Sequence, residues 1–229
     1  MLDGKKGYRW AEQIGNTISG SKIEYLSDNE KQETKRLWHS CFPEDTDKFI
    51  EYYYSEKTKD NRILVKKDSG LIVSMTQLNP YRVSMKDKEI DTFYVVGVAT
   101  DAGRRREGHF RDVFLQMMQD MNEEKVPFLF LMPADANIYL PLDFAYMCEL
   151  PLMELTREAK ERLTAVVCHD NEEDCQKAAE FMEQWLSARF DMYCLRDGAY
   201  VSRLLKELDS ENGIMEFLYD GDNLAGLKA

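Results

Sequence analysis

The chain has 229 residues, of which 44% are hydrophobic and 11% aromatic. This is the composition of an ordinary globular protein, and the length allows one large domain, or one domain with part of a second. Acidic residues outnumber basic residues by 42 to 30, which gives a net charge of −12. Because a negative field repels phosphate backbones and attracts cations, we expect a cationic partner and no nucleic acid.

No apolar run has the length of a membrane span, and the first twenty residues lack the charged-then-apolar pattern of a secretory signal. We therefore expect a cytoplasmic protein with no membrane partner. The cysteines are odd in number and scattered, without a Cys-x-x-Cys pair, and the chain has only three histidines. This pattern argues against a disulfide framework and against a bound metal. The cysteines are Cys41, Cys148, Cys168, Cys175 and Cys194.

Residues 1–21 contain four glycines and little periodicity, and we expect a loose lead-in there. Further along, Ser27-Asp28 is a candidate helix cap, Pro43 ends a helix, and Asp68-Ser69-Gly70 is a hairpin turn. The elements predicted up to residue 100 are a strand over 22–26, helices over about 28–40 and 44–57, a hairpin of 62–67 and 71–78, and a strand over 92–100.

The stretch from Thr92 to Met121 is the most informative. Its first part is β-branched and aromatic and predicts a buried strand, and three arginines follow in the turn after Thr100. From Phe110 onward apolar residues recur at helical spacing and predict an amphipathic helix. A strand that runs through such a turn into a helix directs backbone N–H groups and the positive end of the helix dipole at one point. We therefore predict an anion site at this turn.

The remaining chain divides near Leu155. The elements predicted before it are a strand over 127–132, a short helical segment over 135–140 and a strand over 144–155. The chain after it is charged and mostly helical, with predicted helices over 156–163, 172–190 and up to 208, and then a hairpin of 213–219 and 224–226. A lone hairpin is only marginally stable without further strands, so we expect this chain to be a shortened version of a longer protein.

Within the turn, Arg105 and Gly108 have the spacing Arg-x-x-Gly, with a predicted strand before them and a helix after them. This pattern resembles the acetyl-CoA motif Arg/Gln-x-x-Gly-x-Gly/Ala of the GCN5-related N-acetyltransferases (GNAT). Within that superfamily the chain looks closest to the enhanced intracellular survival (Eis-like) branch. Phe110 departs from the final small residue of the motif, and Ala102 departs from the usual proline.

The resemblance to the Eis-like branch extends beyond the motif to residues 37–43, 129–133 and 138–144. In the last of these, Asp143 replaces the usual glycine. The matching stretches together cover about residues 22–155.

The resemblance implies an α/β fold with a mixed sheet, the GNAT acyl-CoA N-acyltransferase fold, over residues 22–155. The sheet of that fold is splayed where the cofactor enters. Residues 156–229 would then be a helical linker and the start of an incomplete second GNAT-like repeat, in a shortened version of a longer protein. The alternative is a short helical appendage that covers the first domain.

Acetyl-CoA is the cofactor that the resemblance implies. Backbone N–H groups and two guanidinium groups at the turn would bind its pyrophosphate, since a guanidinium suits bidentate contact with phosphate. The pantetheine arm would pair with the end of the preceding strand. The implied cofactor-binding residues are Val98, Ala99, Thr100, Arg105, Arg106, Gly108, His109 and Phe110.

Two residues are candidates for catalysis on the same resemblance. The backbone N–H of Val98 would donate to the thioester oxygen as negative charge develops there. This role requires a bulged strand, and Gly97 is a natural place for a bulge. The phenol of Tyr139 would be the general acid that protonates the departing thiolate.

The implied acceptor is a primary amine of a cationic small molecule, of the aminoglycoside or polyamine type, or of a lysine side chain. Trp38 and Tyr53 are candidates to line its binding site through the faces of their rings, with core packing as the alternative role. The general base stays open between Glu51, Asp91 and a chain of water molecules.

His39 and His109 are less favoured as the base, because a lone histidine is more often packed or solvated. A homo-oligomer is possible on the resemblance alone. The alternative function is a catalytically silent acyl-CoA-binding module that serves as a sensor or scaffold.

Overall fold

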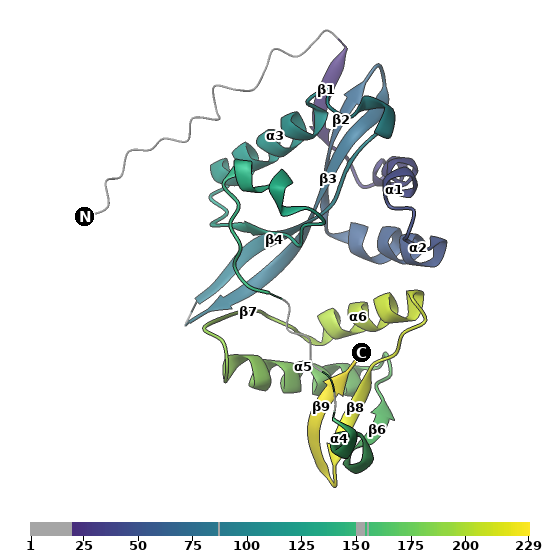
Figure 1. The fold of residues 1–229 in the computed structure, drawn as a ribbon, viewed down its shortest axis with the longest axis vertical. Coiled ribbons are helices and arrows are strands. Elements are labelled where there is room, and N and C mark those ends of the chain that lie inside the picture. The colour runs from purple at the N-terminus through teal and green to yellow at the C-terminus, as the bar shows by residue number, and fades with distance from the viewer. Residues whose placement is uncertain (1–19, 87, 150–153, 155) are drawn as a thin grey trace, which may run out of the picture. The chain divides into compact units, whose positions relative to one another are not determined.

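The computed structural model describes residues 20–86, 88–149, 154 and 156–229. The chain divides into two compact units, Met1–Leu131 and Met132–Ala229, and each is presented by itself (Figure 1). The predicted lead-in lies outside the described residues except for its last two positions. The predicted domain boundaries at residues 21 and 155 remain predictions.

The first unit is built on a mixed sheet. Its strands lie side by side in the order β1-β2-β3-β4-β5. The first three pairings are antiparallel, and β5 joins β4 in parallel. The strands are β1 (Ser21–Tyr25), β2 (Arg62–Asp68), β3 (Leu71–Met85), β4 (Lys88–Thr100) and β5 (Leu129–Phe130).

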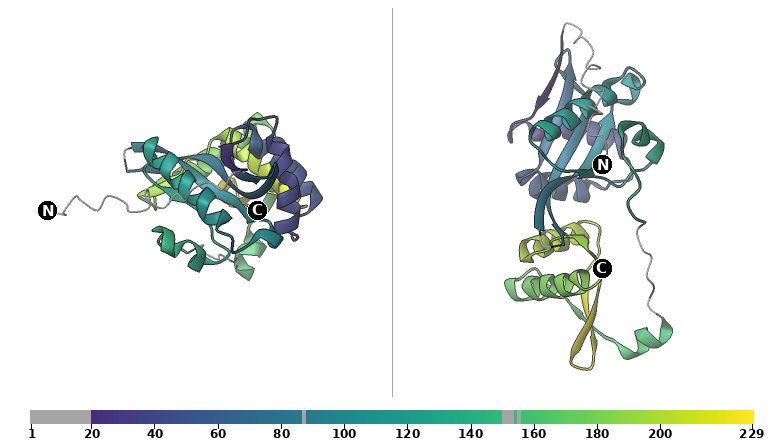
Figure 2. Two further views of the ribbon diagram at one scale, coloured as in Figure 1. Left: turned by 90° about the horizontal axis from the view of Figure 1, so that it is seen from above. Right: turned by 90° about the vertical axis from the view of Figure 1, so that its left-hand side faces the viewer.

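Helices cover both faces of this sheet. Figures 1 and 2 show α1 (Lys35–Cys41) and α2 (Asp47–Glu56) on one face and α3 (His109–Glu123) on the other. Because the sheet is covered on both sides, three consecutive residues of β2, Ile63 to Val65, are all at most 1% exposed. The short 3-10 helices of this unit are η2 (Lys31–Thr34), η3 (Lys57–Lys59) and η4 (Ala102–Arg104).

Local sequence explains where the helices begin and which face they bury. The side chain of Thr46 accepts a hydrogen bond from Phe49 N and caps α2. The apolar stripe predicted for α3 is confirmed, since the helix buries one face against the sheet. The buried residues of α3 are His109, Val113, Phe114, Leu115, Met117 and Met121.

The second unit has its own sheet and its own core. Three strands lie in the order β6-β8-β9, with antiparallel pairings throughout. Residues of two helices and of β8 form one hydrophobic cluster with Cys168 and Met215. The elements are η5 (Ala136–Ile138), η6 (Leu140–Leu142), α4 (Arg157–Arg162), β6 (Thr164–Val167), α5 (Glu172–Ser187), β7 (Met192–Cys194), α6 (Gly198–Ser210), β8 (Glu216–Asp220) and β9 (Asn223–Lys228).

Most predicted elements are confirmed within a few residues, but two predicted strands differ and two observed strands were not predicted. Residues 144–149 and 154 form no strand, although one was predicted over 144–155. The strand predicted over 127–132 shrinks to the two residues of β5, while β6 and β7 were not predicted. These strands are short, and β6 is exposed at all four positions, so it lacks the alternation that marks a half-buried strand.

Among the residues that the structure describes, no helix has the length and apolar character needed to cross a membrane.

Lys31 is a buried cation with three acceptors. Its Nζ donates to Thr58 O at 2.8 Å and to Asn61 O at 2.7 Å, and lies 2.8 Å from a carboxylate oxygen of Asp28. The side chain thereby ties η2 to the chain segment that enters β2. A buried ammonium is tolerated here because all three of its donors are used.

We expect Lys31→Met to lower the free energy of unfolding by about 2–3 kcal/mol, because two buried carbonyl groups lose their donor. The control is Lys59→Met, since Lys59 is exposed and its ion pair with Glu56 is of the kind that contributes less than about 1 kcal/mol. Denaturant unfolding of both variants measures the difference. Equal small losses would show that the buried contacts of Lys31 are not needed.

Candidate active site

Strand β4 contains a bulge beside Val98. Met75 lies opposite Ala99 and Gln77 lies opposite Val96, so Thr76 alone faces both Gly97 and Val98. Two residues against one is the defining geometry of a β-bulge. Gly97 has φ +58°, in the left-handed region that favours glycine. The bulge expected at Gly97 is therefore confirmed.

A side chain cannot be added at this bulge without moving its neighbours. A Cβ on Gly97 would lie 2.9 Å from Trp38 Cζ3 and 3.3 Å from Gln77 Cγ. Both neighbours are buried, Trp38 at 3% and Gln77 at 0% exposure. The core behind β4 therefore holds the bulge tightly.

The other edge of β4 opens after Tyr94. β5 pairs with β4 only at Phe93 with Leu129 and at Tyr94 with Phe130, whereas β4 continues to Thr100. In the described part of the chain, β3 and β5 are the only strand neighbours of β4. Residues 95–100 therefore present a strand edge to which an extended ligand can add.

The loop between β4 and α3 is exposed. Asp101 accepts a hydrogen bond from Gly103 N at 3.0 Å and fixes the start of the loop. Residues 105–108 all lie at the surface. Gly108 is the N-cap of α3, with φ +86° and no side-chain cap, and a Cβ built on it would meet no atom within 4 Å. The N-terminus of α3 thus faces open space, as an anion site at a helix start requires.

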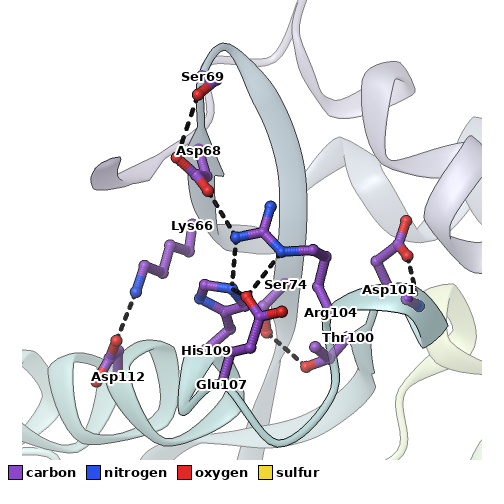
Figure 3. A network of polar contacts seen from close by, with 11 residues as sticks. Lys66, Asp68, Ser69, Ser74, Thr100, Asp101, Arg104, Glu107, His109 and Asp112 are labelled. Atoms are coloured by element: carbon purple, nitrogen blue, oxygen red, sulfur yellow. Dashed lines mark hydrogen bonds and ion pairs between the residues drawn. The ribbon is translucent and has the colours of Figure 1, made fainter. Parts of the chain in front are cut away.

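Arg104 is held inside this loop by ion pairs (Figure 3). Its Nη2 lies 2.6 Å from Asp68 Oδ2 at the end of β2, and its Nε lies 2.7 Å from Glu107 Oε2. The guanidinium therefore ties the loop to the sheet. The two arginines that follow, Arg105 and Arg106, are exposed and extend from the same loop.

The Arg104 guanidinium lowers the pKa of Asp68 and the pKa of Glu107 through its hydrogen bonds to both carboxylates. Both groups therefore remain ionised well below neutral pH. Their contribution to the folded loop is complete above the ordinary carboxyl pKa and is lost as the pH falls through the lowered values.

His109 is turned into the same cluster. Its Nε2 lies 3.0 Å from Glu107 Oε2 and 3.2 Å from Arg104 Nη2. The side chain is only 8% exposed, and Nδ1 is buried with no hydrogen-bond partner among the described residues. The backbone N–H of His109 can therefore donate to an anion, whereas its ring stabilises the loop through its contacts with Arg104 and Glu107.

The strand end and the loop are also joined. Arg105 Nε donates to Thr100 O at 3.4 Å, and the Cys41 thiol donates to the same carbonyl at 3.4 Å. Ser74 Oγ donates to Ala99 O at 3.0 Å. The end of β4 is thus fixed by donors from three directions. Val98, Ala99, Thr100, Arg105, Arg106, Gly108, His109 and Phe110, predicted as one site, lie on one continuous strand, loop and helix start.

Two departures from the family pattern have structural explanations. Phe110 packs its ring 5.2 Å from that of Phe114, centroid to centroid, so its bulk is accommodated on α3. Asp143 has φ +63°, and aspartate is among the residues that tolerate the left-handed region where a glycine is usual.

Trp38 and Tyr53 were predicted to line an acceptor site, but each is only 3% exposed. Their ring centroids lie 4.5 Å apart within the core between α1, α2 and the sheet. Trp38 Nε1 donates to Asp45 Oδ2 at 2.7 Å, and Tyr53 Oη donates to Asn79 Oδ1 at 3.0 Å. With their faces covered and their polar atoms bonded, both residues act in packing, and neither presents a ring face to an acceptor.

Tyr139 lies between η5 and η6, in the second unit. Its backbone N–H donates to Ala136 O, its carbonyl accepts from Leu142 N, and its half-buried ring lies 5.9 Å from that of Phe144. The short helical segment predicted there is confirmed.

The candidate bases differ in their surroundings. Glu51 is exposed and pairs with Lys35 at 2.7 Å, Asp91 is exposed on β4, and His39 lies 3.8 Å from Asp47. His109 is committed to the Arg104 cluster. None of these surroundings selects one residue as the base.

Sequence patterns missed two features of the first unit. The first is the group of Asp68, Arg104 and Glu107, which involves a residue 36 positions away from Arg104. The second is a group of three half-buried rings at the end of the β4–β5 ladder, with centroids 5.3 to 6.1 Å apart. Its members are Tyr81, Tyr94 and Phe130.

These features fit a cofactor of the coenzyme A type. The exposed loop offers backbone N–H groups and two exposed cationic side chains for a pyrophosphate, and no Cβ obstructs Gly108. The open edge of β4 offers hydrogen-bonding groups for an amide-containing arm. The bulged strand and the exposed loop together have the features that a site for a phosphate-bearing acyl carrier requires.

A sequence profile of the acetyltransferase (GNAT) domain family matches residues 22–147, which is more than half of the chain. The chain therefore belongs to the family of GNAT acetyltransferase domains.

Solved structures share the fold at low sequence identity. A protein from Enterococcus faecalis, titled a "probable N-acyltransferase", is similar with a TM-score of 0.66 and 13% identity, over 89% of this chain and 53% of its own. A GCN5-related N-acetyltransferase from Kribbella flavida is similar with a TM-score of 0.64 and 13% identity, over 90% of this chain and 54% of its own. This chain thus spans about half the length of these two proteins. No curated protein matches it.

We expect Arg105→Ala to weaken binding of coenzyme A by roughly 5- to 100-fold, since one charge-assisted contact to phosphate is worth about 1–3 kcal/mol. Amide exchange of residues 102–110 should rise only slightly, because the exposed Arg105 side chain makes one long hydrogen bond, from Nε to Thr100 O at 3.4 Å. Calorimetry and hydrogen exchange measure the two quantities.

Arg104→Ala is the matched control. It should speed amide exchange in the loop, because Asp68 and Glu107 lose their common partner, and it should weaken binding only through that loosening. If Arg105→Ala leaves the affinity unchanged, the loop does not hold the cofactor phosphates.

Proposed function

We propose that this protein is an acetyl-CoA-dependent N-acetyltransferase that acts on a primary amine. The observation that carries the proposal is the bulge at Gly97 and Val98, which lies on an open strand edge that leads directly into an exposed helix start. A bound acyl carrier needs these two features together. Family membership supports the same activity.

Acetyl-CoA would supply the acetyl group as a thioester. In the proposed reaction, Arg105, Arg106 and the backbone N–H groups at the start of α3 hold the pyrophosphate. The N–H of Val98 donates to the carbonyl oxygen as the amine nitrogen attacks and negative charge develops there. As the new C–N bond forms and the C–S bond breaks, Tyr139 gives its proton to the sulfur. The amine loses its proton to a base or to water.

A cationic acceptor is supported by charge and by aromatic residues. The net charge is −12, which attracts cations. The rings of Tyr81, Tyr94 and Phe130 are half-buried beside the point where the open edge of β4 begins. Aromatic faces bind ammonium groups, so we propose these rings for the acceptor side in place of Trp38 and Tyr53. An aminoglycoside, a polyamine and a lysine side chain all satisfy this chemistry.

A catalytically silent acyl-CoA-binding module is the second candidate. It is favoured by the surroundings of the candidate bases, since Glu51 is ion-paired with Lys35 and His109 is committed to Arg104 and Glu107. Tight binding of acetyl-CoA with no thiol release for any amine would support this alternative.

We expect Tyr139→Phe to lower turnover by roughly 10²-fold, because the leaving thiolate loses its proton donor, while the affinity for coenzyme A stays the same. The assay is thiol release from acetyl-CoA with a panel of a polyamine, an aminoglycoside and a lysine peptide. Tyr146→Phe is the matched control, since Tyr146 is a tyrosine of the same unit that is 77% exposed. Equal turnover in Tyr139→Phe and wild type would remove Tyr139 from the mechanism.

We propose further that the second unit opens another GNAT-like repeat, as in the Eis-like branch. A strand, two helices and a hairpin follow one another in both units, as β1-α1-α2-β2-β3 and as β6-α5-β7-α6-β8-β9, where the three-residue β7 has no counterpart between α1 and α2. The strands have the same order and the same antiparallel pairing, β1-β2-β3 and β6-β8-β9. Structural neighbours that are longer than this chain, which covers 53% and 54% of their lengths, are consistent with such a repeat.

The two hairpins agree in detail. Each has a two-residue turn, Ser69-Gly70 in one and Gly221-Asp222 in the other. In each hairpin, two cross-strand residue pairs follow the turn, and the next residue of the second strand is a bulge residue with no partner in the register. The bulge residue is Val73 in β3 and Ala225 in β9. Bulges are usually kept within a protein family, so a bulge at the same position in both hairpins supports a common origin.

The strand before the helices agrees as well. Leu26 N donates to Ile63 O at 2.9 Å in the first unit, and Cys168 N donates to Met215 O at 2.9 Å in the second. All four residues are at most 7% exposed. The same backbone contact therefore lies at the same place in both cores.

We expect the turn of the first hairpin to function in the second. Gly221→Ser combined with Asp222→Gly reproduces Ser69-Gly70 and should change the free energy of unfolding by less than about 1 kcal/mol, because Ser69 adopts nearly the same φ (+51°) as Gly221 (+59°). Gly221→Val is the control, since a β-branched residue is strained in the left-handed region and should cost about 1–3 kcal/mol. A double variant as damaging as the control would contradict the equivalence of the two hairpins.

A further inference from the structure

A closed ring of buried hydrogen bonds lies behind the bulge of β4. Asn61 Nδ2 donates to Gln77 Oε1 at 2.9 Å, and Gln77 Nε2 donates to Tyr54 Oη at 3.4 Å. Tyr54 Oη and Thr34 Oγ1 are 2.6 Å apart, and Thr34 Oγ1 donates to Lys31 O at 2.7 Å. Lys31 Nζ closes the ring by donating to Asn61 O at 2.7 Å.

The directions of the two hydroxyl hydrogen bonds in this ring follow from its geometry. Because Thr34 Oγ1 gives its proton to Lys31 O, it must accept from Tyr54 Oη, and the phenol oxygen is then free to accept from the Gln77 amide. Burial raises the pKa of Tyr54 to about 12, so the phenol keeps the proton that this arrangement needs.

All five members are buried, with exposures from 0% to 5%. Burying so many polar groups is costly unless each is bonded, so apolar side chains would fill the same space more cheaply. The ring lies within the hydrophobic layer between the sheet and the α1–α2 face, where nothing in the packing alone calls for amides. Its placement therefore needs another explanation.

Gln77 is the member that touches the bulge. It is the β3 partner of Val96, the last regular pair before the bulge, and its Cγ and Nε2 lie 3.3 and 3.4 Å from where a Cβ of Gly97 would be. The ring fixes the amide of Gln77 from both sides. Gly97 is thus confined between a rigid amide and the indole of Trp38.

We infer that Gln77 is a positioning residue for acetyl transfer: the buried ring holds its amide against Gly97 and so orients the backbone N–H of Val98. The inference rests on the proposed function, in which that N–H stabilises the developing charge. Gln77 touches neither cofactor nor acceptor and acts only through the bulge.

The test compares Gln77→Met with Thr58→Val. Methionine keeps the shape of glutamine and removes its amide. Thr58 is equally a buried polar residue, and its hydroxyl donates to Tyr54 O at 2.7 Å, but its side chain is outside the ring and away from Gly97. Gln77→Met loses its two buried hydrogen bonds of the ring and Thr58→Val loses one, so both variants should lose thermal stability, Gln77→Met the more.

We expect kcat of Gln77→Met to fall roughly 10- to 100-fold, since a small misplacement of a catalytic donor has an effect of this size. Its affinity for coenzyme A should stay within about twofold of wild type, because the loop at Gly108 is untouched. Thr58→Val should keep the wild-type kcat. A kcat of Gln77→Met that equals that of Thr58→Val would overturn the inference.

Tyr54→Phe is the second variant if Gln77→Met does not fold. It removes only the hydroxyl that links Gln77 to Thr34, and it should lower kcat in the same selective way but less. An unchanged kcat in folded Tyr54→Phe would count against the ring.

A spectroscopic readout separates this inference from the proposed function. In the labelled wild-type protein, acetyl-CoA should shift the Val98 amide resonance more than coenzyme A does, and Gln77→Met should abolish that difference. If wild type transfers no acetyl group to any amine but the Val98 resonance behaves as described, the activity is wrong and the positioning role stands. If the Val98 resonance is the same in wild type and variant, the positioning role is wrong.

Discussion

The bulge at Gly97 is the constraint on which the rest of the site depends. A regular antiparallel pair would direct the N–H groups of β4 alternately toward β3 and away from it. One extra residue opposite Thr76 changes this alternation at Val98, and the early end of β5 leaves the same part of β4 open on its other edge. The local geometry of β4 at Val98 therefore follows from a change of register in the backbone.

The loop at Gly108 has a different requirement. It must keep cationic side chains exposed while its backbone stays ordered. Arg104 is neutralised by Asp68 and Glu107, and that ion-paired group anchors the loop to β2. Arg105 and Arg106 carry the same charge on neighbouring positions but remain at the surface. Three consecutive arginines thus have two roles, and only the ion pairs of the folded loop distinguish them.

Features that depend only on neighbouring residues could be predicted from the sequence. The hairpin turn at Ser69-Gly70, the apolar stripe of α3 and the glycine of the bulge each follow from residues within one element. Features that join distant segments could not be predicted, such as the pairing of Asp68 with Arg104. The prediction that Trp38 and Tyr53 line an acceptor site is wrong for a related reason. In a sequence, an aromatic residue that lines a binding site cannot be told from one that packs in the core.

The two hairpins also bear on why the polar ring exists. In the proposed GNAT-like repeat of the second unit, a ring that served only to fold the hairpin against its two helices would be needed as well. In the shared register, Asn61 corresponds to Gly213 and Gln77 corresponds to Ala229, and neither of these carries an amide. The second hairpin therefore keeps its turn, its bulge and its buried contacts without the ring. In the first unit, the amide of Gln77 lies against Gly97 of the bulge, which accounts for its place there.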